Sequence, residues 1–416
     1  MCILALKDET FDNILTKCHQ QEKQLTIQYL ERLDQEIAAR LNKKRWELIR
    51  IDKRTILSSF GIITFKHRYY YDKFLKERIY PLDNLLGVPK NTRITNELRL
   101  RILDLASIMS YREVGTHISS EFELSKSTIF RIVKDTVIEQ CFDSLINRGN
   151  LKIHVQIDEK FIGMTNSKNK KRYYTLTIFA GKEMVENSKR NRLLNKTVLS
   201  SSVLKDLKVK LNEILRSRYK VKPDEEIFVS GDMANYIQNF KDDIMVCKAR
   251  YVPDKFHAYQ AIKDSLPEVY IDDISLNDVG FQRYLYKQLA LIDAVDAIKI
   301  RGLMKRNPKC FESYLDKEYL GCSQEGQNSH IYAPRFGKYA NRFNPDTIEK
   351  LSLVREGVIN KSKIIVGSKT RRSPELSDFR LYDLPALEER IKYVLDTRNM
   401  KYETRKIFNA IKYGTF

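Results

Sequence analysis

Two aspartates follow apolar segments that are typical of buried strands. Asp158 comes after the run IHVQI and Asp232 after IFVSG, whose final glycine lets backbone come close to a ligand. Because strand ends converge at one edge of an α/β sheet, we expect the two carboxylates to lie close together. Carboxylates hold Mg²⁺, and two ions roughly 4 Å apart would activate a nucleophile and stabilise the leaving oxygen of a phosphodiester. Each aspartate alone is more commonly a helix cap or ion-pair partner, but the pair in a basic chain favours metal chemistry.

A third carboxylate is needed to fix both ions, and four glutamates are candidates. Glu325 lies in GCSQEGQNSH, which is typical of the entry to a helix and is rich in small polar residues. Glu312 and Glu318 belong to a charged segment that is more simply a solvated face, and Glu349 follows later in the chain. The chemistry of these residues alone leaves the choice open.

Asp254 and His257 form a D-x-x-H step at the predicted start of a helix. A single histidine is more often a structural residue than a ligand, and no cysteine lies near enough in the sequence to suggest zinc. An orienting or DNA-contacting role stays open for this pair.

The charge of the chain favours a polyanionic partner. The 416 residues include 74 lysines and arginines against 54 aspartates and glutamates, a net charge of +20. Each basic side chain that neutralises a phosphate releases a counterion, which favours nucleic acid. The sequence has neither the apolar run of a membrane span nor that of a secretory signal. Six scattered cysteines without a CxxC pair fit a reducing compartment, so we expect a cytoplasmic protein that joins the nucleoid when bound to DNA.

The elements that would position the acids alternate between strands and helices over residues 150–262. Strands are predicted in HVQIDEKFIG, its hairpin partner KRYYTLTIFAGK, KTVLSS, EEIFVSGD and KARYVP, with an amphipathic helix over residues 201–219. This pattern predicts an α/β core. Residues 263–320 are predicted to be an α-helical insertion, and residues 321–360 to return to the core with a helix.

Residues 1–90 are predicted to form a helical region followed by a β-hairpin. Helical spacing over residues 8–48 indicates one long helix or a broken pair, with a packing or oligomerisation role preferred. The hairpin turns at Phe60-Gly61. Its second strand places cations beside a run of tyrosines, which suits either nucleic acid or simple packing.

Residues 91–145 have the layout of a helix-turn-helix. A helix near Glu97–Met109 is followed by two short helices, with Ser125 as the N-cap of the last one. The DNA-contacting candidates on its leading turns are Lys126, Ser127, Thr128 and Arg131. Any three-helix bundle could share this pattern, and the net charge favours DNA binding.

Residues 361–416 form a basic tail with a net charge of +6 and a helical pattern in ERIKYVLDTRNM. It has no paired strand-end acids. We expect this tail to add DNA affinity without chemistry.

Seven segments between about residues 50 and 340 carry a family resemblance in their order. They are RTILSSFGIITFKHRYYYD, PLDNLLGVPKNTRIT, LDLASIMSYREVG, HVQIDEKFI, GDMANYI, VPDKFHAY and GCSQEGQNSH. Together they resemble the DDE transposases of ISLre2-type insertion sequences, also catalogued as an uncharacterised protein family and related to Mutator-like transposases. The resemblance implies an α/β fold with an RNase H-like catalytic core, interrupted by the helical insertion.

Carried over to this chain, the resemblance makes Asp158, Asp232 and Glu325 the catalytic and metal-binding residues. Asp254 and His257 match the accessory D-x-x-H step. The family usually continues into a Gly-Trp-Ser element, which this chain does not share, since its one tryptophan is Trp46.

The function that follows is that of a DNA transposase, which cleaves element ends and transfers strands with two Mg²⁺ ions, for which Mn²⁺ can substitute. Its expected partners are double-stranded DNA, as terminal repeats and target, and further copies of the chain on that DNA. A non-catalytic DNA-binding regulator and an RNase H-like nuclease are the alternatives.

Overall fold

The computed structural model describes residues 11–368 except for 87, 89–91, 143–145, 166, 168, 187–190 and 338–341. These residues belong to one of the two units into which the chain divides, Met1–Lys369. The helix predicted in the basic tail lies outside the described residues. No helix of the described part is long and apolar enough to cross a membrane.

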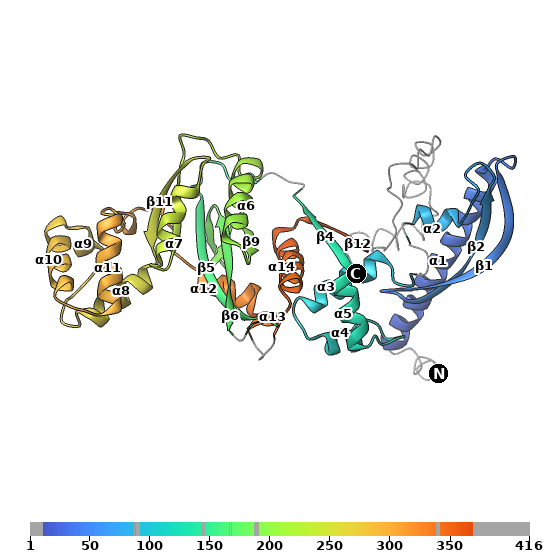
Figure 1. The fold of residues 1–416 in the computed structure, drawn as a ribbon, viewed down its shortest axis with the longest axis horizontal. Coiled ribbons are helices and arrows are strands. Elements are labelled where there is room, and N and C mark those ends of the chain that lie inside the picture. The colour runs from blue at the N-terminus through green and yellow to red at the C-terminus, as the bar shows by residue number, and fades with distance from the viewer. Residues whose placement is uncertain are drawn as a thin grey trace, which may run out of the picture. The chain divides into compact units, whose positions relative to one another are not determined.

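The N-terminal region is a helix packed on a β-hairpin (Figure 1). The predicted helix over residues 8–48 is wrong at its end: the helix stops at Arg40, and Trp46 begins a strand whose residues pair with the tyrosine-rich run. The predicted turn at Phe60-Gly61 is confirmed, and Gly61 has a φ of 104°, which a glycine adopts without strain. The elements are α1 (Phe11–Arg40), β1 (Trp46–Ser58), β2 (Gly61–Asp72), β3 (Glu77–Ile79) and α2 (Pro81–Leu85).

Three capped helices follow, as the sequence predicts. They are α3 (Asn96–Ala106), α4 (Tyr111–His117) and α5 (Lys126–Asp135). Ser125 is the N-cap of α5, and its hydroxyl accepts a hydrogen bond of 3.2 Å from the Thr128 amide. A Cβ on Gly115 would lie 2.0 Å from the Leu124 carbonyl oxygen, so only glycine allows α4 to approach the turn before α5 this closely.

A mixed five-stranded sheet, the central sheet, confirms an α/β fold. Its strand order is β11-β10-β5-β6-β9, with β5 parallel to β10 and antiparallel to β6. The amphipathic helix α6 packs its apolar stripe on one face (Figure 1). The elements of this part are β5 (His154–Gly163), β6 (Lys170–Phe179), β7 (Lys182–Met184), β8 (Asn191–Leu193), β9 (Thr197–Ser201), α6 (Leu204–Ser217), β10 (Glu226–Gly231), α7 (Asn235–Gln238) and β11 (Lys248–Pro253).

The segment after β11 is helical, as predicted. Its apolar side chains, such as Leu285, Leu289 and Ile300, belong to the same hydrophobic core as buried side chains of the sheet. The elements are α8 (Lys255–Ser265), α9 (Asp273–Asn277), α10 (Val279–Ala290), α11 (Val295–Arg306) and the 3₁₀ turn η3 (Glu312–Tyr314).

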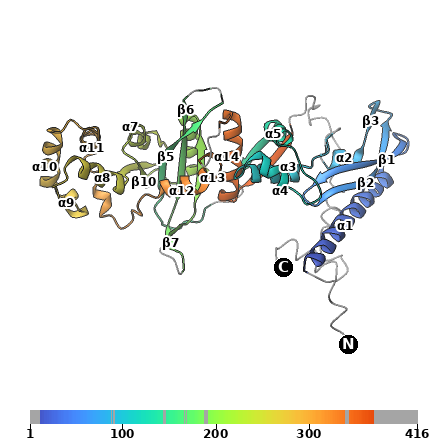
Figure 2. The ribbon, with the colours of Figure 1, turned by 90° about the horizontal axis from the view of Figure 1, so that it is seen from below.

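The chain then returns to the sheet, where α12 and α13 lie along β5 and β6 (Figure 2). These last elements are α12 (Gln324–Ile331), α13 (Ala333–Phe336), α14 (Pro345–Asn360) and β12 (Lys363–Ser368). The expectation that everything from Lys361 onward is a tail is wrong for β12. This strand pairs with β4 (Thr136–Cys141) in a two-stranded antiparallel sheet, a long-range pairing that local sequence does not reveal.

Candidate active site

The register of the central sheet brings Asp158 and Asp232 together. The parallel pairing of β5 with β10 ends where Ile157 faces Gly231, so the next residue on each segment is an aspartate. Neighbouring paired strands lie about 4.8 Å apart, so the two aspartates leave the sheet from neighbouring positions, and the Asp232 charge acts on the Asp158 carboxyl. The expectation that Asp158 ends its strand is wrong, because β5 continues to Gly163 alongside β6. Only the pairing of β5 with β10 ends beside Asp158.

Gly231 is the residue that permits this close approach. A Cβ at this position would lie 2.4 Å from the Ile157 carbonyl oxygen and 2.9 Å from a methyl carbon of Ile237. Any side chain would therefore push β10 away from β5. The sequence predicts that this glycine allows the close approach of a ligand. In the structure, it allows the close approach of two strands.

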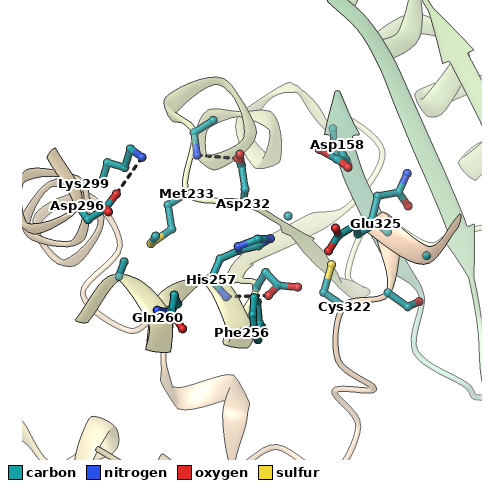
Figure 3. Close-up of a pocket in the computed structure, with 18 of the residues that line it drawn as sticks. Asp158, Asp232, Met233, Phe256, His257, Gln260, Asp296, Lys299, Cys322 and Glu325 are labelled. Carbon is teal, nitrogen blue, oxygen red and sulfur yellow. Dashed lines mark hydrogen bonds and ion pairs between the residues drawn. The ribbon is translucent and has the colours of Figure 1, made fainter. Parts of the chain in front are cut away.

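The two aspartates and Glu325 line one cavity of about 660 Å³ (Figure 3). The Glu325 carboxylate points from the first turn of α12 toward the space that both aspartates face. Of the four glutamates considered as a third ligand, Glu325 is the one that lines this cavity. Glu318 forms an ion pair with Lys152 at 3.8 Å, and Glu349 accepts a hydrogen bond from the Ser202 amide.

Asp158 is a half-buried carboxylate whose two oxygens are both held. One oxygen accepts a hydrogen bond of 2.7 Å from the Glu159 amide and the other a bond of 2.6 Å from the Asn328 side chain. Burial raises the pKa of Asp158, and the neighbouring Asp232 carboxylate adds to the rise against these two hydrogen bonds. A cation between the two aspartates would relieve both unfavourable influences.

Asp232 is positioned by the turn that begins after β10. Its carboxylate accepts a hydrogen bond of 2.8 Å from the Ala234 amide, and its carbonyl oxygen accepts one of 2.8 Å from the Tyr251 hydroxyl. Tyr251 is buried in the adjacent strand β11. The Asp232 side chain is thus held by the turn after β10, and its backbone carbonyl is held by β11.

The start of α12 is tied to β5 by Gln156, which the sequence analysis did not single out. The Gln156 amide nitrogen donates to the Gly321 carbonyl at 2.8 Å, and its oxygen accepts from the Ser323 amide at 3.1 Å. Asn328, in the last turn of α12, holds Asp158 from the same helix. The available signal was a glutamine inside the apolar run IHVQI. Such a residue is buried, as the structure shows, and a buried amide needs hydrogen-bond partners.

The D-x-x-H step has a structural explanation for its aspartate. Asp254 is the N-cap of α8 and accepts a hydrogen bond of 3.1 Å from the backbone amide of His257. The His257 ring is exposed and lines the cavity, opposite α12 (Figure 3). Cys322 also lines it, and burial together with Asp254 raises the pKa of its thiol, so it is a neutral group there.

The acids that line the cavity offer carboxylate oxygens, the ligands that Mg²⁺ prefers. Among the described residues, no group of three or more histidine, cysteine, aspartate or glutamate side chains is arranged so that it could hold a metal ion. Asp158 follows the last β5–β10 pair on β5, Asp232 follows it on β10, and Glu325 lines the same cavity from α12. The chemistry of the set suits a hard cation.

The predicted DNA-contacting residues lie on α5, away from this cavity. Lys126, Ser127 and Arg131 are exposed, and Thr128 is half-buried beside the Ser125 cap. Neither Lys126 nor Arg131 forms an ion pair with any residue that the structure describes.

A model of the uncharacterised protein family UPF0236 matches residues 4–270, which include both aspartates and the D-x-x-H step but end before Glu325. A UPF0236 protein of Caldanaerobacter subterraneus subsp. tengcongensis is 24% identical over 359 residues, which are 82% of this chain and 73% of that protein. Another from the same strain, whose name joins eleven designations from TTE0033 to TTE2212, is 24% identical over 365 residues and has the same coverage. The UPF0236 protein in the vanSb 3′ region of Streptococcus gallolyticus is 28% identical over 113 residues, 27% of this chain and 22% of that protein.

Proposed function

The chain belongs to the uncharacterised protein family UPF0236, and we propose that it is a DNA transposase that cleaves element ends and joins them to target DNA. The observation that carries the proposal is the adjacency of Asp158 and Asp232 at the point where β10 leaves β5, with Glu325 on the same cavity. Three carboxylates from distant parts of the chain face one space, in a protein with a net charge of +20.

The order of the strands supports an RNase H-like core. Along the chain, the first three long strands of the central sheet are antiparallel neighbours, and the next two add in parallel on the far side of the first. This is the topology that we expect from the resemblance to RNase H-like transposases. The helices after β11 then fill the interval between the second acid and the third.

In this mechanism Asp158, Asp232 and Glu325 would hold the metal ions. A bound pair of Mg²⁺ ions would supply activation of the attacking hydroxyl and stabilisation of the leaving oxygen of the phosphodiester. The chain keeps the carboxylates oriented: the Glu159 amide and Asn328 fix Asp158, and the Ala234 amide fixes Asp232. Gln156 holds the entry of α12, which orients Glu325. His257 lines the cavity, and in this proposal it would contact the DNA or orient a phosphate oxygen.

The three capped helices α3, α4 and α5 support a DNA-binding role of the helix-turn-helix type. The leading turn of α5 carries exposed polar and cationic side chains on the face opposite its buried Ile129, Ile132 and Val133. A recognition helix reads the major groove with its N-terminal residues, which here are Lys126, Ser127 and Arg131.

The name of one relative adds a genomic argument. It joins eleven designations from one strain, which fits a gene present in many copies, as the gene of a mobile element is.

The experiment is an assay of the purified protein with end-labelled DNA that spans the sequences on both sides of its gene. We expect strand cleavage at the element ends in Mg²⁺ or Mn²⁺, none in EDTA, and joining of the 3′-hydroxyl ends to target DNA. Cleavage without joining would favour the nuclease alternative. Tight, specific binding without metal-dependent cleavage would favour the regulator.

A further inference from the structure

Strands β5 and β6 continue past the acidic cavity as a two-stranded arm. The pairing of β10 with β5 ends at Ile157 and that of β9 with β6 at Tyr174, whereas β5 and β6 stay paired as far as Gly163 and Lys170. At about 3.3 Å per residue, the arm extends roughly 17 Å beyond Asp158. We define the β5–β6 arm as residues 159–163 and 170–173.

The arm carries an excess of positive charge at its surface. Lys170, Lys171 and Arg172 are exposed, and Glu159 is the one acid within the arm. Arg172 pairs with Glu159 at 3.1 Å. Lys170 and Lys171 form no ion pair with any residue of the described part of the chain. Two cations at the arm are therefore available to a partner.

An exposed aromatic ring shares one face of the arm with Lys170 and Arg172. The Phe161 side chain is 51% exposed, although a phenyl ring gains free energy when it leaves water. The Arg172 guanidinium lies 5.7 Å from the centre of this ring and 5.6 Å from that of Tyr236. Cations bind the phosphate backbone of nucleic acid, and aromatic rings beside them pack on its sugars or bases.

The arm is also held firmly in place. The Phe343 amide donates to the Gly163 carbonyl at 2.9 Å, and the Thr165 amide donates to the Phe343 carbonyl at 3.0 Å. Phe343 is buried edge-on against Phe336, and the Arg335 guanidinium covers its ring at 4.9 Å. An arm fixed in this way loses little conformational entropy when it binds a partner.

We propose that the β5–β6 arm binds the phosphate backbone of duplex DNA next to the phosphodiester at the acidic cavity, with Lys170 and Lys171 as the contacts. This inference rests on the proposed function. The arm begins at the residue after Asp158, and its basic residues lie roughly 10–17 Å along the strands from Asp158. This distance corresponds to about three to five base pairs at 3.4 Å each. An acidic protein surface would match the charge, but not the continuity of the arm with a cavity built for phosphodiester chemistry.

The test compares two double variants with the parent chain. Lys170→Ala with Lys171→Ala removes the arm cations and spares the Arg172–Glu159 pair. Lys222→Ala with Lys248→Ala is the matched control, because both lysines are exposed and lie before or at the amino ends of β10 and β11, at the edge opposite Asp232. Fluorescence anisotropy with a labelled 40-base-pair duplex of arbitrary sequence in EDTA gives the affinity and its salt dependence, and polyglutamate is the competing probe.

We expect the arm variant to bind on the order of tenfold more weakly, with a salt slope smaller by about 1.8, since each phosphate contact contributes about 0.9. The control should bind like the parent. Equal affinity and slope for the arm variant and the control would overturn the inference, as would a parent that binds no duplex or that prefers polyglutamate. The cleavage assay judges the proposed function separately. A parent that cleaves while the arm variant binds normally refutes the arm alone, and a parent that needs the arm for binding but never cleaves refutes the transposase.

Discussion

Asp158 is the residue at which the electrostatics of the cavity can be tested directly. Its pKa is raised by burial and by the Asp232 carboxylate, so the folded protein binds a proton at this site more tightly than the unfolded chain does. Stability then falls as the pH rises from the unfolded pKa of about 3.9 through the folded pKa, and the ionised group remains unfavourable above it. The negative charge of Asp158 is therefore unfavourable at neutral pH, and a bound metal ion would compensate it.

The substitution Asp158→Asn should make the metal-free protein at least as stable as the parent at pH 7. The difference should shrink as the pH falls through the raised folded pKa of the Asp158 carboxyl, because the parent side chain then also becomes neutral. Thermal unfolding in EDTA across this pH range measures both effects. Asp272→Asn is the opposite control, because hydrogen bonds from Ser275 lower the pKa of this N-cap aspartate and its charge stabilises the fold at neutral pH. A large loss of stability in Asp158→Asn at pH 7 would mean that the bonds to the Glu159 amide and Asn328 outweigh the charge.

Gly231 sets the distance between the two aspartates. We expect Gly231→Ala to lower the free energy of unfolding by about 1–3 kcal/mol, because its Cβ would lie 2.4 Å from the Ile157 carbonyl oxygen. Gly326→Ala on α12 is the control, since nothing lies within 4 Å of its added Cβ. Alanine there should raise stability by up to about 1 kcal/mol through helix propensity. Urea unfolding measures the free energy of unfolding of both variants. A Gly231→Ala protein as stable as the parent would disprove the close strand contact.

At the level of the helices, α5 and α12 have separate tasks. α12 presents Glu325 to the cavity and is held on the sheet by Gln156 and by its own Asn328. α5 presents Lys126 and Arg131 to solvent, beyond the reach of the cavity lining. Binding and chemistry should therefore respond to different substitutions.

Replacing both Lys126 and Arg131 with alanine should weaken binding to the element ends and reduce the salt slope by about 0.9 for each phosphate that the helix no longer neutralises. Lys205→Ala with Arg216→Ala on α6 removes the same two residue types from exposed positions and should bind normally. Anisotropy titrations at several salt concentrations measure both quantities. An α5 variant that keeps the parent affinity and slope while folded would exclude this helix from the DNA interface.

The individual elements could be predicted because their signals are local. Alternation around Gly61, the Ser125 cap and the apolar run before Asp158 each reflect neighbours in the sequence. The end of α1 was missed because neither glycine nor proline lies between Arg40 and Trp46, so no local signal marks the change from helix to strand. Gln156 was missed because a polar residue in a strand reveals its partners only when the fold is known.

Across the whole molecule, the decisive features depend on pairings between distant segments. Asp158 and Asp232 are neighbours because β10 joins β5 in parallel with Gly231 opposite Ile157, a register that no local pattern specifies. The pairing of β12 with β4 joins residues more than 200 positions apart. The common cavity of Asp158, Asp232 and Glu325 could be anticipated only through the family resemblance.

The pairing of β12 with β4 separates two truncations. Removal of residues 369–416, which carry a net charge of +4, should weaken DNA binding but leave a folded protein with metal-dependent activity. Removal of residues 361–416 also deletes β12 and the Ser362 hydroxyl that accepts a bond from Gln140, so this protein should unfold at a lower temperature. Thermal unfolding and anisotropy of both proteins test this. If the shorter deletion binds DNA but loses all activity, the removed segment completes the active site.

Cleavage of labelled element ends by acid variants tests the central claim, that Asp158, Asp232 and Glu325 act as one catalytic unit. Asp158→Asn, Asp232→Asn and Glu325→Gln should each lower the rate by orders of magnitude in Mg²⁺, and their combination should cost little more than one of them. Glu312→Gln, which changes a glutamate outside the cavity lining, should cleave like the parent. An active Asp158→Asn protein, or an active Glu325→Gln beside an inactive Glu312→Gln, would contradict the account.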